Sequence, residues 1–95
     1  MLTHVVLFKF KSRDPQIAAE ARDKLRVLPA QIAQIQGYEV GVNIIPSARA
    51  YDLALVSRFD SAETLRAYQE HPAHLPVVAW MGEHCESLVA VDVEG

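Results

Sequence analysis

The sequence predicts an α+β fold of the ferredoxin-like type, a βαββαβ sandwich in which helices cover one face of a four-stranded sheet. Strand-like alternation of apolar residues occurs in four separate segments. Helical spacing of apolar residues occurs after the first and after the third of these segments. With right-handed crossovers, this order of elements closes into a single antiparallel sheet with its helices on one side.

The first strand is expected over Leu2–Phe10, a segment rich in β-branched and aromatic residues. Its two faces are both largely apolar, since Val6 and Phe8 alternate with Val5 and Leu7. Both faces of the sheet should therefore be covered at this strand.

A first helix is expected after Asp14, whose side chain can cap it, with Pro15 in its first turn. Apolar residues then continue at helical spacing and predict one continuous stripe that ends at Gly37. Pro29 should cause a kink or a restart of the helix near Leu28. The stripe consists of Ile17, Ala21, Leu25, Leu28, Ile32 and Ile35.

The second half of the chain is predicted from the same signals of alternation, capping and chain breaks. The His71-Pro72 pair should end the second helix. The expected elements are a strand over Tyr38–Ile45, a turn over 46–49, a strand over Tyr51–Phe59, a helix from Ala62 to about Glu70, a helical turn or two over Leu75–Gly82 and a last strand over Ser87–Val93.

Length and composition indicate one domain over residues 1–95. The chain is 51% apolar, which is enough to form a core, and its net charge of −3 argues against nucleic acid as a partner. No apolar run approaches the roughly 20 residues that span a bilayer, so no membrane partner is expected. The single cysteine, Cys85, excludes an internal disulfide, and we expect a cytoplasmic protein.

The helices can cover only one face of the predicted sheet, yet apolar residues occur on both. Leu7 and Val56 would lie on the uncovered face, together with one side of the last strand. An uncovered apolar sheet is an association surface, and the economical way to cover it is a second copy of the same chain. We therefore expect a homodimer with its two sheets face to face.

Two motifs carry a resemblance to a known family. They are His-x-Val-x-Phe-Lys, which begins at His4, and Tyr-x-x-His-Pro-x-His, which runs from Tyr68 to His74. With the segments around them, they make the chain similar to the stress-responsive A/B barrel (Dabb) domain over nearly its whole length. The resemblance implies a dimeric α+β barrel.

The resemblance implies less about activity, because most Dabb members have no assigned function and some are induced by stress in plants. One plant member catalyses a cofactor-free aldol cyclisation of a linear polyketide. Its catalytic tyrosine and histidine correspond to Tyr68 and His74, and a further histidine of its pocket corresponds to His4. The resemblance thus points to a cyclase or lyase without cofactor or metal.

The residue types fit such chemistry. A histidine can accept a proton near neutral pH, and a tyrosine hydroxyl can bond to a developing enolate. We expect His74 to be a general base, Tyr68 to stabilise the oxyanion and His4 to orient the substrate or His74. The residues expected to bind a small hydrophobic substrate are His71, Phe8, Val77 and Leu88.

Other interpretations stay open at this stage. His4 can be a core histidine with a bonded partner, and residues 71–74 can form a structural corner between helices. A zinc site of His71, His74 and either His4 or His84 is disfavoured, because no carboxylate or cysteine lies at suitable spacing. The sequence also leaves open the binding of a divalent cation by backbone oxygens at a dimer edge. The alternatives to an enzyme are a non-catalytic ligand-binding or stress-associated protein and a structural dimeric module.

Overall fold

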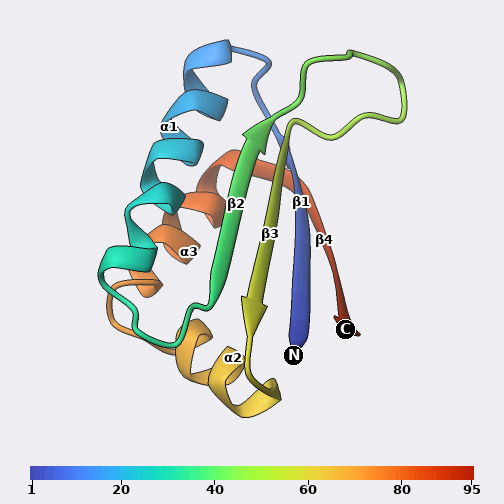
Figure 1. Cartoon of the computed structure of the whole chain (residues 1–95). Helices are drawn as coiled ribbons and strands as arrows, with labels where there is room; N and C mark the ends of the chain where they lie inside the picture. The colour runs from blue at the N-terminus through green and yellow to red at the C-terminus, as the bar shows by residue number, and fades with distance from the viewer.

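A computed structural model describes residues 1–95 and has the predicted ferredoxin-like architecture (Figure 1). The sheet has the order β2-β3-β1-β4, and every pair of neighbouring strands is antiparallel. The elements are β1 (Leu2–Phe10), α1 (Pro15–Arg26), a 3-10 turn (Leu28–Ala30), β2 (Gly37–Val42), β3 (Leu53–Phe59), α2 (Ala62–Gln69), α3 (Leu75–His84) and β4 (Cys85–Glu94).

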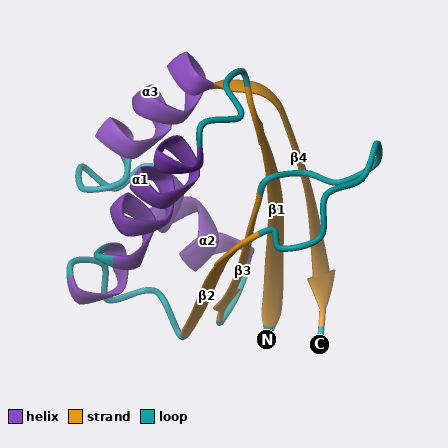
Figure 2. Cartoon of the chain, turned by 90° about the horizontal axis from the view of Figure 1, so that it is seen from above, coloured by secondary structure: helices purple, strands orange, loops and turns teal.

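The helices α1, α2 and α3 all lie on one side of the sheet, and the other side carries no helix (Figures 1 and 2). The core forms between the helices and the sheet face that they cover. It includes Phe8 and Phe10 of β1, Leu25 of α1 and Phe59 of β3. None of the helices is long and apolar enough to cross a membrane.

The restart expected near Leu28 is confirmed, but the prediction that the helix continues from there to Gly37 is wrong. Helix α1 ends at Arg26, and a 3-10 turn follows in which the N–H groups of Gln31 and Ile32 both donate to the Leu28 carbonyl, each at 2.9 Å. Pro29 has no N–H and cannot continue the α-helical bonding. Leu28 and Ile32 are nevertheless buried, and Gly37 begins β2 instead of ending a helix.

The bounds of the later elements also differ from those predicted. Strand β2 stops at Val42, which pairs with Leu53, so residues 43–52 form a loop that was partly expected as strand. Helix α3 is longer than expected and leads directly into β4 at Cys85. The alternation of apolar residues continues past Val42, but the ladder ends where β3 no longer lies beside the chain.

The alternation predicted for β1 is confirmed. His4, Val6 and Phe8 are buried against the helices, whereas Leu7 is exposed on the bare face and Val5 is half-buried there. Since β1 lies between β3 and β4, its two sets of side chains mark the middle of each face.

Candidate functional site

A cavity of about 470 Å³ lies between the β1–β4 half of the sheet and helices α2 and α3. This volume is typical of binding sites for small molecules, whose volumes are about 300–1,000 Å³. Val78 and Leu88 line it and are both half exposed, so the cavity opens to solvent between α3 and β4. The apolar part of the wall includes Val6, Phe8, Leu25, Leu55, Val77, Val78, Met81, Leu88 and Ala90.

His4 and Asp92 form one polar pair at the cavity. The two residues are directly opposite in the β1–β4 ladder, and His4 Nδ1 is hydrogen-bonded to Asp92 Oδ1. The imidazole is buried and lines the cavity, whereas the carboxylate is partly exposed. In the neutral imidazole, donation from Nδ1 to the carboxylate leaves the lone pair on Nε2, so the Asp92 contact orients His4 Nε2 as an acceptor.

Tyr68 and Tyr38 form a second polar pair. Tyr68 is placed by α2, which begins with a capping box between Ser61 and Thr64. Its hydroxyl lies 2.8 Å from the Tyr38 hydroxyl, and its ring packs against Phe59 with centroids 5.1 Å apart. Burial raises the pKa of Tyr68 and, more strongly, that of Tyr38, so both phenols stay protonated at neutral pH.

His74 lies at the corner between α2 and α3. Its Nδ1 donates to the Gln69 carbonyl at 3.1 Å, which leaves the lone pair on Nε2. Its ring lies against the Tyr68 ring, with centroids 4.3 Å apart, and lines the cavity. Burial lowers the pKa of His74, and the nearby His4 and His71 imidazoles lower it further, against the raising effect of the Gln69 carbonyl. His74 is therefore a neutral acceptor at neutral pH.

The structure brings together most of the residues predicted for the site, but not His71. His4, Tyr68 and His74 all line the cavity, together with Phe8, Val77 and Leu88. His71 lies outside the wall, and its Nδ1 accepts the N–H of Ala73 at 3.0 Å. One histidine of the corner thus stabilises the chain break, while the other faces the cavity.

Two polar residues of the site were missed in the sequence. Asp92 was not predicted as a site residue, although pairing of the first and last strands would have suggested it as a partner for His4. Tyr38 was placed on a strand face with no role, and no local spacing indicates its bond to Tyr68, 30 residues away. The histidines do not gather with acidic or cysteine side chains into a group of three or more that could hold a metal ion.

Comparison with known proteins agrees with this fold. The model of the Stress responsive A/B Barrel Domain, Dabb, matches residues 2–95. The chain belongs to the Dabb family. An uncharacterized protein of Streptomyces coelicolor is 36% identical over 93 residues, covering 95% of this chain and 96% of the relative.

Two solved structures show how far the likeness extends among Dabb-like folds. A dimeric protein of unknown function and ferredoxin-like fold from Bacteroides fragilis is 31% identical, with a TM-score of 0.88 over 99% of this chain and 95% of that one. A hydroxynitrile lyase from Passiflora edulis is 18% identical, with a TM-score of 0.83 over 97% of this chain and 90% of that one. The second likeness is one of fold alone.

Proposed function

We propose that this Dabb protein is a homodimeric, cofactor-independent enzyme of the cyclase or lyase type that acts on a small hydrophobic carbonyl compound. The observation that carries the proposal is the convergence of His4, Tyr68 and His74 in a cavity whose wall is mainly apolar. Each imidazole is fixed through Nδ1, and in its neutral form keeps an acceptor at Nε2. Oriented acceptors that face a cavity are better suited to proton transfer than to a purely structural role of the histidines.

The reaction starts with removal of a proton next to a carbonyl group. The C–H bond breaks, its proton goes to Nε2 of His74, and its electron pair moves onto the carbonyl oxygen. The Tyr68 hydroxyl, kept protonated by burial, donates a hydrogen bond to this oxygen. No redox partner enters, because the proton is the only group transferred in this step.

Bond formation then uses the same groups. The enolate carbon attacks a second carbonyl of the same molecule, and the new alkoxide takes back the proton that His74 holds. Run in reverse, the sequence is a lyase reaction that breaks a carbon–carbon bond. His4 Nε2, oriented by Asp92, accepts a hydrogen bond from a substrate hydroxyl and so positions the molecule.

The dimer is supported by the bare face of the sheet. Leu7, Val89, Val91 and Val93 are exposed there, although such a row of apolar side chains normally finds a cover. The similar protein of Bacteroides fragilis is described as dimeric. The half-buried thiol of Cys85, with no second cysteine, fits a cytoplasmic location.

Deuterium exchange at the α-carbon of 4-phenyl-2-butanone in D₂O, followed by proton NMR, tests the proposal without knowledge of the natural substrate. The ketone is hydrophobic, carries one carbonyl and measures the first proton transfer directly. The wild-type protein should accelerate exchange above the buffer rate. His74→Ala should reduce this acceleration by at least about 100-fold, as expected for loss of a general base. Tyr68→Phe should also reduce the acceleration by about 100-fold, because this substitution removes the hydrogen-bond donor to the enolate oxygen.

His84→Gln is the matched control. Its imidazole stacks on Trp80 with centroids 3.9 Å apart and does not line the cavity, so this variant should exchange at the wild-type rate. Equal exchange by wild type and His74→Ala would show that His74 is not the base. If the ketone binds, as seen by saturation-transfer NMR, but exchange stays at the buffer rate, the non-catalytic ligand-binding function is correct instead.

A further inference from the structure

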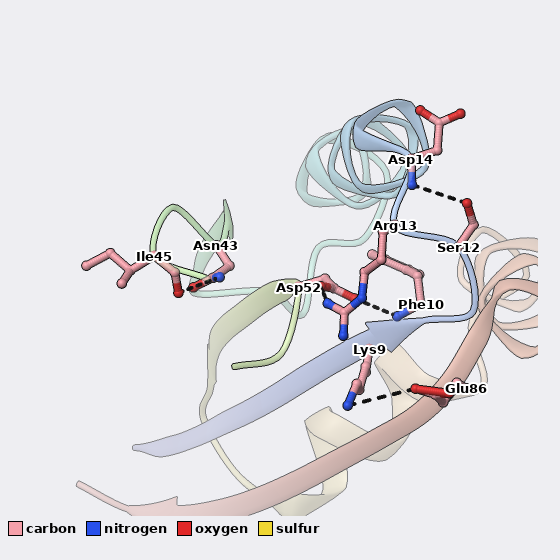
Figure 3. Close-up of polar contacts among 9 residues, drawn as sticks. All are labelled: Lys9, Phe10, Ser12, Arg13, Asp14, Asn43, Ile45, Asp52 and Glu86. Carbon is pink, nitrogen blue, oxygen red and sulfur yellow. Dashed lines mark hydrogen bonds and ion pairs between the residues drawn. The ribbon is translucent and has the colours of Figure 1, made fainter. Parts of the chain in front are cut away.

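The loop of residues 43–52 between β2 and β3 stands out from the rest of the molecule. It extends away from the sheet on the side opposite the helices (Figures 1 and 2). Ile44 and Ile45 are 87% and 71% exposed, which makes them the most exposed large apolar side chains of the protein. Figure 3 shows the Ile45 side chain pointing away from the domain. We call residues 43–52 the arm.

The arm is held in place by hydrogen bonds at its base. The N–H of Asn43 donates to the Asp52 carbonyl at 2.9 Å, and the N–H of Asp52 donates to the Phe8 carbonyl at 2.8 Å. The Asp52 carboxylate accepts from the N–H of Phe10 at 2.8 Å and from Arg13 Nη1 at 2.6 Å (Figure 3). These bonds tie the base of the arm to β1 and fix the direction in which the arm leaves β2 and β3.

Hydrogen bonds within the arm also define its shape. Asn43 Nδ2 donates to the Ile45 carbonyl at 3.0 Å (Figure 3), and the N–H of Ala50 donates to the Ser47 carbonyl at 3.2 Å. Both isoleucines are thus presented to solvent by a bonded loop. Such exposure of apolar side chains costs free energy unless a partner covers them.

We propose that Ile44 and Ile45 pack against a second copy of this chain, so that the arm of each protomer clasps its partner. The inference rests on the dimer of the proposed function and extends it. The arm projects on the bare side of the sheet, and a copy that covers Val89 and Val91 lies beside it. On the bare face, Leu7 pairs with Val89 of β4 and with Ala54 of β3, so apolar side chains extend across the sheet toward the base of the arm.

A second copy fits the arm better than an unlike partner does. In a two-fold dimer each arm meets the other protomer, so one loop sequence supplies two equal contacts. Residues 43–51 contain a single charged side chain, Arg49, and a charge-poor segment of this kind suits the core of an interface. Two arms of like sequence also bring no large charge of one sign to the contact.

The double variant Ile44→Ser/Ile45→Ser tests the proposal by sedimentation velocity over a dilution series. Loss of four buried isoleucines per dimer should raise the dissociation constant by at least about 100-fold. Val27→Ser is the matched control, since Val27 is 54% exposed but lies at the end of α1, in the helical layer. Its dissociation constant should equal that of the wild type. Circular dichroism checks that each variant is folded.

A mixed dimer of isotope-labelled and unlabelled chains tests the same contact without a substitution. Isotope-filtered NOEs from the methyl groups of Ile44 and Ile45 to the unlabelled chain should be present. Absence of these NOEs in a dimer, or a folded double variant that dissociates like Val27→Ser, would overturn the clasp and leave the dimer intact. A wild-type protein that is monomeric at micromolar concentration would instead overturn the dimer of the proposed function, and the clasp with it.

Discussion

The two faces of the sheet are built from the same strands but differ in what lies on them. On the helix-covered face, apolar side chains surround His4, Tyr68 and His74, and each polar group has a bonded partner. On the bare face, valines of β4 and Leu7 are exposed and no helix covers them. One face therefore has the composition of a binding site, and the other has that of a contact between proteins.

The difference arises from the alternation of side chains along a strand. In β1, His4 and Val6 point to the cavity, while Val5 and Leu7 point to the bare face. A single four-stranded sheet can in this way carry a cavity on one face and exposed apolar side chains on the other. Substitutions on the two faces should consequently have separable effects.

The largest effect is expected when a charge is placed on each face in turn. Val6→Asp buries an unpaired carboxylate at a residue that is 7% exposed, and should lower the free energy of unfolding by about 3–5 kcal/mol. Val91→Asp, at a residue that is 54% exposed, should leave the monomer folded but weaken the dimer by at least about 100-fold. Urea denaturation and sedimentation measure the two quantities. Equal loss of unfolding free energy in both variants would remove the distinction between the faces.

A smaller effect should come from the tyrosine pair of the covered face. Tyr68→Phe leaves the Tyr38 hydroxyl without its partner and should cost about 1–3 kcal/mol of unfolding free energy. The double variant Tyr38→Phe/Tyr68→Phe removes both hydroxyls and should cost less than the sum of the two single variants. Urea denaturation of the four proteins gives this coupling. Strict additivity would mean that the two hydroxyls do not interact.

The smallest effect is a pH dependence from His74. Its pKa is lower in the folded protein than in the unfolded chain, where it is about 6.5, so the unfolded chain binds more protons at acidic pH. The free energy of unfolding should therefore fall as the pH drops below about 6.5 and be constant for this group above that value. His74→Gln should reduce this slope between pH 5 and pH 7 in urea titrations. An unchanged slope would show that His74 does not titrate differently in the two states.

Most of the fold could be predicted because strands and caps leave local signals. The period of two in Leu2–Phe10 and the Asp14-Pro15 start of α1 both match the structure. The apolar stripe up to Ile35 led to the wrong prediction of a continued helix. Its spacing indicates which residues are buried and does not indicate which residues are helical. Leu28 enters the core from the 3-10 turn that contains Pro29, and Ile32 enters it from the loop after that turn.

The candidate site was only partly predictable for a related reason. His4, Tyr68 and His74 occur in motifs, so their chemistry is visible in the sequence, and the structure adds that they share a cavity. Asp92 and Tyr38 join the site through partners that are distant in the sequence. Asp92 bonds to His4 across two paired strands, and Tyr38 of a strand bonds to Tyr68 of a helix. Contacts of this kind depend on the register of the folded sheet and leave no local pattern.

One experiment tests the division between the two faces most directly, namely methyl NMR of protein labelled at its valines. Addition of 4-phenyl-2-butanone should shift the methyl signals of Val6, Val77 and Val78, which line the cavity. Dilution should shift those of Val89 and Val91 on the bare face, with little overlap between the two sets. The account would be contradicted if the ketone shifted the valines of the bare face and left those of the cavity unchanged.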